Sequence, residues 1–191
     1  MVTIGYCYYN NHPEFQWVVD YYNSDQWNQF DFCVVDDGSS VELPKCNWTK
    51  IRIDHDYELW NNEGARNVMA DFLDTGWILF MDVDYVLKDN SILDILDTLD
   101  KNTAYFGHRD RPEQYKKVHP NLFLIHSDYF EDIGGYKLRG YCDHLSLLNE
   151  LKKDYLVELH FIDNPVIETP KPKTRRQPET EEYVPTKARI I

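Results

Sequence analysis

Residues Trp77–Met81 form a run of five apolar side chains, which is typical of a short strand buried on both of its faces. Asp82 and Asp84 follow this run at once, separated by a single valine. Because a buried carboxylate without a partner is unfavourable, the strand must end where the two aspartates reach solvent or a cation. The fold therefore needs a buried central strand whose carboxyl end opens into a crevice.

Strand-like apolar runs alternate with helical periodicity along most of the chain. The predicted strands cover residues 2–9, 32–36, 51–54, 77–81, 103–107, 121–125 and 155–162. Helices are predicted after Pro13, from Asn61, after a cap at Ser91, at 127–133 and around 145–151. The buried face of the second helix is expected to contain Ala65, Val68, Met69, Phe72 and Leu73. This alternation predicts an α/β fold with a mostly parallel central sheet and helices on both faces, and such sheets collect functional residues at the carboxyl ends of their strands.

The length of 191 residues fits one domain. Residues 1–168 are expected to fold as that domain, and residues 169–191 have the composition of a C-terminal tail or lid. With 42% hydrophobic and 15% aromatic residues, the chain has enough apolar surface to offset the entropy of ordering, which excludes a disordered protein.

The cysteine pattern and the first residues of the sequence indicate the expected cellular compartment. The four cysteines show no C-x-x-C spacing, and Cys7 and Cys33 lie in strand-like runs, so buried free thiols are expected instead of disulfides or a zinc site. The first residues lack the features of a signal peptide, and no apolar run approaches the ~20 residues of a membrane span. The expectation is a soluble, cytoplasmic protein.

Asp82 and Asp84 are candidate metal ligands. One intervening residue allows both carboxylates to face the same ion at the end of a strand. Hard oxygen ligands suit Mg²⁺ or Mn²⁺, with water and substrate phosphates completing the coordination. The alternative for this pair alone is an exposed turn with two solvated aspartates.

Four motifs occur in order along the chain: VVDDGSS at 34–40, NNEGARN at 61–67, FMDVDYVL at 80–87 and FEDIGGYKLRGYCDHLSLL at 130–148. Together they resemble a family 2 glycosyltransferase of the GT-A fold, a Rossmann-like α/β domain, and the match runs from about Thr3 to Leu148. The resemblance implies an inverting, metal-dependent enzyme that moves a sugar from a nucleoside diphosphate sugar to an acceptor hydroxyl.

The resemblance assigns the nucleotide to the first strand and the D-D-G-S loop. Tyr8, Asn10, Asp36 and Asp37 would hold the base and the ribose. A carboxylate can accept the imide N–H of uracil and a tyrosine can stack on its ring, so a uridine nucleotide is expected. Asp37 and Gly38 also fit an ordinary turn, which is the alternative.

The same resemblance assigns Arg66, Asp82 and Asp84 to the diphosphate. Arg66 would contact the donor near its diphosphate or ribose, close to the positive end of a helix, and a surface salt bridge is its alternative. Asp82 would contact the donor and, with Asp84, bind the Mn²⁺ or Mg²⁺ that neutralises the leaving diphosphate. His160 would complete the metal site, or pack as an ordinary strand histidine.

Asp143 is implied as the catalytic base that removes the proton of the acceptor hydroxyl. The family pattern reads Glu-Asp here, whereas this chain has Cys142 before Asp143, and Asp143 also suits the N-cap of the following helix. Gly134, Gly135 and Tyr136 would form the wall under the sugar, and the two glycines also fit a helix terminus.

The acceptor and any further partner are less constrained. A net charge of −13 opposes general attraction to nucleic acid or an anionic membrane. Basic residues cluster in two segments, which could be a lid over the donor phosphates, a contact with an anionic acceptor, or solvated loops. These segments contain Arg109, Arg111, Lys116 and Lys117, and Lys171, Lys173, Arg175 and Arg176. The acceptor is left open among a glycan, a lipid-linked intermediate, a small molecule and a protein.

Three rival functions remain. A noncatalytic sugar-nucleotide-binding scaffold or sensor would keep the fold without turnover. A glycosyltransferase acting on nucleic acid would use the basic tail for backbone contacts. A nucleotidyltransferase would need a glycine-rich, lysine-bearing N-terminal motif, which the segment TIGYCYYNNHPE does not contain.

Overall fold

The computed structural model describes residues 1–55, 60–73, 76–108, 118–136, 160–162, 166–168 and 188–191. Its first half contains β1 (Val2–Tyr8), α1 (His12–Tyr21), the short 3₁₀ turn η1 (Asp25–Trp27), β2 (Asp31–Asp37), β3 (Thr49–Ile53), α2 (Asn62–Phe72) and β4 (Trp77–Met81). Next come β5 (Tyr85–Leu87), α3 (Ile92–Ile95), η2 (Leu96–Thr98), β6 (Tyr105–His108), β7 (Val118–His126) and α4 (Ser127–Asp132). The last elements are β8 (His160–Ile162), β9 (Val166–Glu168) and β10 (Ala188–Ile190).

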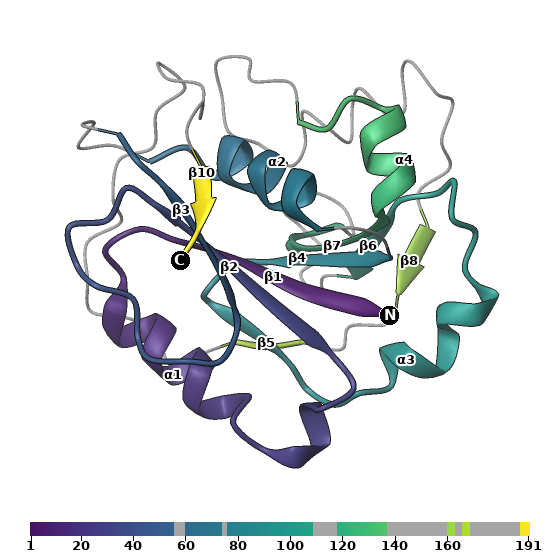
Figure 1. Cartoon of the computed structure of the whole chain (residues 1–191). Helices are drawn as coiled ribbons and strands as arrows, with labels where there is room; N and C mark the ends of the chain where they lie inside the picture. Colours follow the sequence, from purple (N-terminus) through teal and green to yellow (C-terminus); the bar gives the residue numbers. More distant parts are fainter. Residues whose placement is uncertain (56–59, 74–75, 109–117, 137–159, 163–165, 169–187) are drawn as a thin grey trace.

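In this part of the chain, eight strands form one sheet in the order β10-β3-β2-β1-β4-β7-β6-β8 (Figure 1). Strands β3, β2, β1 and β4 run parallel, whereas β7 pairs antiparallel with both β4 and β6, and β10 pairs antiparallel with β3. Strands β5 and β9 form a separate antiparallel pair. The mostly parallel sheet was predicted from the sequence, but the reversed direction of β7 was not.

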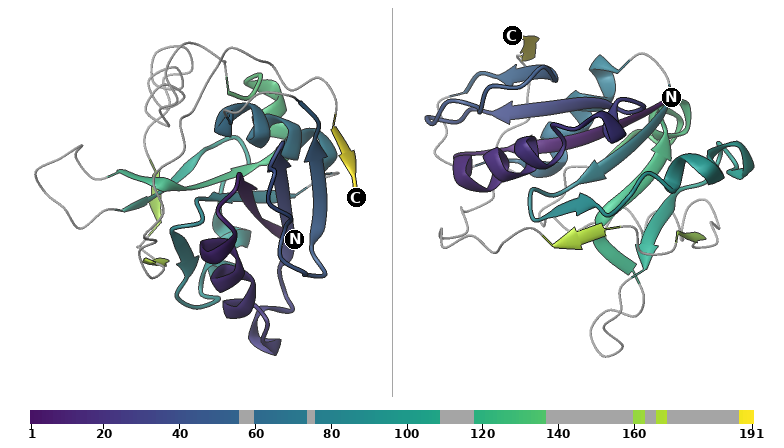
Figure 2. Two further views of the ribbon diagram at one scale, coloured as in Figure 1. Left: turned by 90° about the vertical axis from the view of Figure 1, so that its left-hand side faces the viewer. Right: turned by 90° about the horizontal axis from the view of Figure 1, so that it is seen from below.

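Strand β1 lies in the middle of the sheet and buries side chains on both faces. Val2, Ile4, Tyr6 and Tyr8 belong to an apolar cluster that also contains Phe15 of α1. The opposite face carries a second apolar cluster, to which Cys7 contributes together with residues of α2 and α4. Figures 1 and 2 show α1 on one side of the sheet and α2 and α4 on the other, which confirms the predicted helices on both faces.

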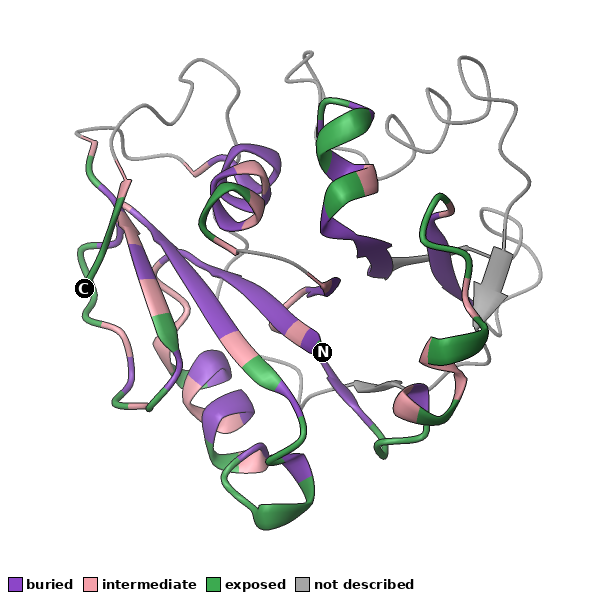
Figure 3. Cartoon of the chain, turned by 45° about the vertical axis from the view of Figure 1, so that its right-hand side comes forward, coloured by how far each residue is buried: buried purple, intermediate pink, exposed green. Residues whose placement is uncertain are grey.

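Helix α2 packs its apolar face on the sheet and is capped by a polar side chain. Ala65, Val68 and Met69 are buried against β1 and β2, while the side chain of Asn61 accepts a hydrogen bond of 2.8 Å from the backbone N–H of Gly64. The predicted apolar face is too long at its end, because Phe72 is 37% exposed. Phe72 is the last residue of α2, so no further helical turn follows to cover it. Figure 3 shows that the central strands are mostly buried, whereas the helices carry exposed residues.

The predicted helix after Ser91 is also shorter than its apolar spacing suggests. Helix α3 ends at Ile95 and continues as the 3₁₀ turn η2. The Ser91 hydroxyl makes no capping hydrogen bond and instead donates to Oδ1 of Asp89 at 2.5 Å. A nearby carboxylate therefore competes with the backbone for this hydroxyl, and the predicted cap is wrong.

Among the described residues, the cysteines are free thiols, as the sequence predicted. Cys7 and Cys33 are buried and free, as predicted, and Cys46 is a half-buried free thiol. Among the helices that the structure describes, none has the length and apolar character needed to cross a membrane.

Leu79 of β4 provides a test of the central packing. Its side chain has no exposed surface, and its neighbours in the sheet are Ile4 and Leu124. Leu79→Ala should lower the free energy of unfolding by about 2–5 kcal/mol, because it leaves a cavity in a close-packed layer. Phe72→Ala, on the exposed end of α2, should cost less than about 1 kcal/mol. Urea denaturation measures both, and equal costs would contradict the burial described here.

Candidate active site

The two aspartates that follow β4 lie on a tight turn, Asp82–Tyr85, which we call the D-x-D turn. The backbone N–H of Tyr85 donates to the carbonyl of Asp82 at 3.0 Å and closes the turn. The buried hydroxyl of Tyr6 in β1 donates to the carbonyl of Tyr85 at 2.9 Å, and this hydrogen bond anchors the turn to β1. The Asp82 side chain is 28% exposed, and Asp84 is exposed on the tip of the turn.

Arg66, in the first half of α2, is the cation beside this turn. It is 1% exposed, and its Nη2 donates to Oδ1 of Asp82 at 2.7 Å. Its Nη1 donates to the hydroxyl of Tyr136 at 3.1 Å, and the guanidinium carbon lies 5.7 Å from the centre of the Phe80 ring. Burial of a guanidinium is tolerable because its charge is paired and its donors are used. The alternative of a surface salt bridge for Arg66 is therefore wrong.

The segment after α4 closes the other side of Arg66. Burial raises the pKa of Tyr136 to about 12, so its phenol is neutral at physiological pH and accepts the hydrogen bond from Arg66. The side chain of Asn67 donates to the carbonyl of Tyr136 and accepts from its backbone N–H, both at 2.8 Å. Gly134 and Gly135 turn the chain with φ of 75° and 62° directly after α4, which confirms the predicted helix terminus, whereas the wall under the sugar stays a prediction.

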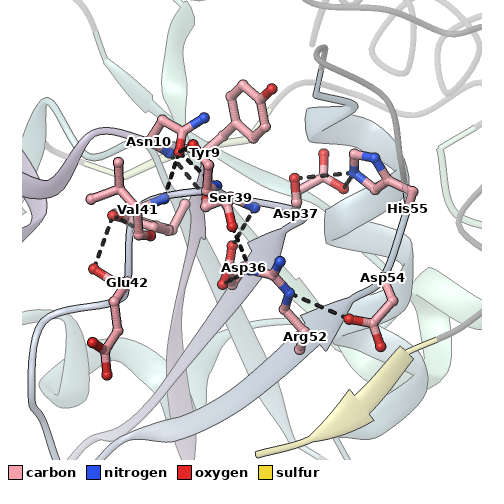
Figure 4. A network of polar contacts seen from close by, with 12 residues as sticks. Tyr9, Asn10, Asp36, Asp37, Ser39, Val41, Glu42, Arg52, Asp54 and His55 are labelled. Carbon is pink, nitrogen blue, oxygen red and sulfur yellow. Dashed lines mark hydrogen bonds and ion pairs between the residues drawn. The ribbon is translucent and has the colours of Figure 1, made fainter.

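The last two residues of β2 and the four that follow, residues 36–41, form what we call the acidic loop (Figure 4). Asp36 is 3% exposed; its Oδ1 accepts from the backbone N–H of Ser39 at 3.0 Å, and its Oδ2 accepts from Arg52. Asp37 is fully buried; its Oδ2 accepts from the backbone N–H of Asn61 at 2.6 Å, and its Oδ1 lies 3.2 Å from Nε2 of His55. Both carboxylates are therefore fixed by the protein before any ligand binds.

Asn10 links the end of β1 to the acidic loop. Its φ of 54° lies in the left-handed region, which asparagine adopts more readily than most residues. Its side-chain oxygen accepts hydrogen bonds of 2.9 Å from the backbone N–H groups of Ser40 and Val41, and its own N–H donates to the Ser39 hydroxyl at 3.0 Å. Asn10 thus orders the loop from the β1 side.

Tyr8 occupies a different environment from the one expected of a base-stacking residue. Its side chain has no exposed surface, its ring packs against Phe15 in the core, and its hydroxyl donates to the carbonyl of Val41 at 3.1 Å. A ring without exposed surface offers no face to a ligand. The next residue, Tyr9, lies directly beyond β1, with its ring parallel to Trp60 at a centroid separation of 6.4 Å.

Arg52 and His55 are site neighbours that the sequence analysis missed. Arg52 is the polar residue between Ile51 and Ile53 in β3, and this alternation was the available signal for a side chain on the opposite face. His55 follows β3 directly and packs against Gly38, where an added Cβ would collide with the imidazole. Strand pairing brings both residues to the acidic loop.

Two further predicted site residues, Asp143 and His160, are not tested by the part of the chain that the structure describes, and the metal role of His160 stays a prediction. Asp143 lies outside the described residues, and its role stays a prediction. The backbone of His160 begins β8, which β6 and β7 separate from β4 by three strand spacings, roughly 14 Å. Across the residues that can be described, no group of three or more histidine, cysteine, aspartate or glutamate side chains converges as a metal site.

The strand order explains why the two acidic segments lie near each other. Strands β2 and β4 flank β1 and run parallel to it, so the acidic loop and the D-x-D turn emerge at the same edge of the sheet. Two strand spacings separate them, roughly 10 Å. Between them lie the end of β1 and the start of α2, whose N-terminus favours anions. The carboxylates of Asp82 and Asp84 are hard oxygen donors and fit Mg²⁺ or Mn²⁺.

A mostly parallel sheet with helices on both faces and acidic turns at the carboxyl ends of its strands is typical of open α/β domains, which bind their ligands at this edge of the sheet. The sequence matches the model of glycosyl transferase family 2 over residues 6–164, so the chain belongs to this family. Among curated proteins, none matches the sequence.

Solved structures with a similar fold are glycosyltransferases of low sequence identity. A mannosyltransferase from Pyrobaculum calidifontis in complex with GDP-Man and Mn²⁺ is 14% identical with a TM-score of 0.63, and the match covers 86% of this chain and 54% of that one. Glucosyl-3-phosphoglycerate synthase from Mycobacterium tuberculosis, in complex with phosphoglyceric acid, is 12% identical with a TM-score of 0.61, covering 90% of this chain and 73% of that one.

A third structure is a variant of the Drosophila β1,4-galactosyltransferase 7 in complex with manganese, UDP-Gal and xylobiose. It is 11% identical with a TM-score of 0.56, and the match covers 84% of this chain and 64% of that one. At these identities the likeness concerns the fold alone, which is the predicted GT-A fold. This chain spans 54% of the mannosyltransferase and 64% of the galactosyltransferase chain.

The two glycines beside Tyr136 form a matched pair of substitution sites. An added Cβ at Gly134 meets no atom within 4 Å, whereas one at Gly135 would lie 2.6 Å from Oδ1 of Asn67. Gly134→Ala should therefore cost only the left-handed backbone penalty of about 1–2 kcal/mol. Gly135→Ala should cost clearly more, because it also breaks the paired hydrogen bonds between Asn67 and Tyr136. Thermal or urea denaturation compares them, and an equal loss would contradict this geometry.

Proposed function

We propose that the chain transfers a sugar from a nucleoside diphosphate sugar to an acceptor hydroxyl, with a divalent cation and with inversion at the anomeric carbon. Membership in glycosyl transferase family 2 supports the reaction class. A uridine nucleotide is the proposed donor base, because a carboxylate can accept an imide N–H, and of the two carboxylates in the acidic loop Asp36 keeps exposed surface (5%) whereas Asp37 keeps none. The acceptor class is left open.

The observation that carries the proposal is the ion pair between Arg66 and Asp82 at the carboxyl end of β4. The arginine is buried, and the partner carboxylate keeps 28% of its side-chain surface. A ligand that reaches the D-x-D turn therefore meets a preorganised cation and two carboxylates in a partly desolvated place. Such an arrangement suits a diphosphate bound together with a metal ion.

The residues have distinct proposed roles. Arg66 is 1% exposed, so from its place beside the D-x-D turn it acts electrostatically on the charge that develops on the leaving diphosphate, and Tyr136 and Phe80 keep the guanidinium in place. Asp82, already held by Arg66, contacts the donor, whereas Asp84 on the tip of the turn is the principal metal ligand. A divalent cation bound there supplies positive charge that stabilises the leaving diphosphate.

Asp143 is the proposed base. A carboxylate within hydrogen-bond reach of the acceptor hydroxyl takes its proton as the oxygen attacks the anomeric carbon from the side opposite the diphosphate. The C–O bond to the acceptor forms while the bond to the diphosphate breaks, which inverts the configuration. The thiol of Cys142 does not replace this base, because an ordinary thiol is mostly protonated at neutral pH.

Asp84→Ala tests the metal role. Calorimetric titration with UDP, GDP and CDP, with and without Mn²⁺, should show one preferred nucleotide whose affinity depends on the metal. The substitution should weaken this metal-dependent binding by at least about tenfold, because a direct charged ligand is lost. Asp94→Ala, an exposed aspartate on α3, is the matched control and should bind as the wild type does. Unchanged binding by Asp84→Ala would remove Asp84 from the site.

Asp143→Asn separates chemistry from binding. The rate of sugar transfer should fall by about 10²–10⁴-fold, the usual contribution of a general base, while the nucleotide dissociation constant stays unchanged. Asp132→Asn, at the exposed end of α4, controls for the change of charge. Loss of nucleotide binding together with transfer would show that Asp143 has a structural role instead.

A further inference from the structure

The last described residues of the chain form a strand at the edge of the sheet next to the acidic loop. Strand β10 pairs antiparallel with β3, and in this register Arg189 lies opposite Arg52. The backbone N–H of Ile191 also donates to the carbonyl of Lys50 at 3.0 Å. The sequence predicts a tail or lid over residues 169–191, whereas the described residues 188–190 pair in the sheet that carries the candidate site.

A continuous network of ion pairs joins this strand to the acidic loop. Arg189 of β10 pairs with Asp54, and Asp54 lies 3.5 Å from Nε of Arg52. Arg52 in turn pairs with Asp36 through Nη1, and the same nitrogen donates to the carbonyl of Ser39 at 3.0 Å. Figure 4 shows Arg52 between Asp54 and the loop, with β10 beside Asp54.

We propose that Arg52 is a positioning residue for the donor nucleotide and that β10 supports it through Asp54, so that the C-terminal strand forms part of the nucleotide site. This inference rests on the proposed function, because it concerns the same acidic loop. Arg52 itself touches the loop and acts on a bound nucleotide through Asp36 and the backbone around Ser39.

The physical basis is the burial of Asp36. Its side chain is 5% exposed, so its charge requires a partner, and Arg52 with 24% exposure supplies it. A guanidinium can serve the carboxylate and the Ser39 carbonyl at once, whereas a lysine presents a single point charge. Removal of Arg52 therefore leaves the buried charge of Asp36 without its cation and removes the contact to the Ser39 carbonyl, one of the contacts that order the loop.

The contribution of β10 is smaller. The side chains of Arg189 and Asp54 are 61% and 42% exposed, and an ion pair at such exposure is weak. Its effect is to hold Asp54, and through it Arg52, in the orientation that faces the loop. Any partner or modification that detaches β10 from β3 would then weaken nucleotide binding without touching the nucleotide.

Two readouts on the full chain test the proposal. Calorimetry with UDP and Mn²⁺ should show about tenfold weaker binding for Arg52→Ala, consistent with loss of a hydrogen-bonded charge. Arg52→Lys should recover part of this loss, and Arg189→Ala should weaken binding about two- to threefold. The double substitution should be no weaker than Arg52→Ala alone, because both act along one path.

Amide hydrogen exchange gives the second readout, which needs no ligand. The N–H groups of Ser39, Ser40 and Val41 should exchange faster in Arg52→Ala, because the loop loses its anchor. Amides of β4 should exchange as in the wild type. Lys50→Ala is the matched control, because Lys50 lies on the same strand and its side chain takes part in none of the loop contacts described above. Removal of this cation should change neither the amide exchange of the loop nor the nucleotide affinity.

The outcomes distinguish this proposal from the proposed function. Unchanged nucleotide affinity and unchanged loop exchange in Arg52→Ala, with a wild type that binds, would overturn the positioning role alone. A wild type that binds none of the nucleotides would overturn the proposed function, and loop exchange would then decide whether Arg52 orders the loop. Equal effects of Lys50→Ala and Arg52→Ala would also overturn the role, because they would reflect net charge alone.

Discussion

The site depends on one nearly buried cation, Arg66, which must be paired to be stable in the interior. Its hydrogen bonds reach different parts of the chain, because Asp82 follows β4 and Tyr136 follows α4. The arginine therefore joins three elements at the carboxyl edge of the sheet. The same charge that stabilises this junction lies beside the D-x-D turn, so stability and anion binding come from one side chain.

The charged groups of the acidic loop are also paired within the protein. Each carboxylate of Asp36 and Asp37 already accepts a backbone N–H of the protein, and each has a basic side chain beside it, Arg52 or His55. A loop ordered in this way loses little conformational entropy when a ligand binds. Of the two carboxylates, only that of Asp36 keeps exposed surface, so a bound nucleotide would share Asp36 with its protein partners, whereas Asp37 supports the loop from within.

Apolar runs and helical periodicity in the sequence predicted most of the strands and helices. The apolar run of β4 and the periodicity of α2 were correct because burial on a face appears directly in residue spacing. The burial of Tyr8 was also predictable, because the alternation of side chains along a strand puts it on the same face as Val2, Ile4 and Tyr6. The pairing of β10 with β3 and of Arg52 with Asp36 could not be predicted, because the register between distant segments leaves no local signal in the sequence.

The central claim is that the D-x-D turn binds a divalent cation together with the diphosphate of a sugar nucleotide. Anomalous scattering from crystals grown with Mn²⁺ and UDP tests it most directly, because it locates the metal without assumptions about activity. The account predicts a manganese peak bonded to a carboxylate oxygen of Asp84 and to a diphosphate oxygen, with Arg66 beside the diphosphate. A nucleotide bound elsewhere, or a metal bonded to neither Asp82 nor Asp84, would contradict it.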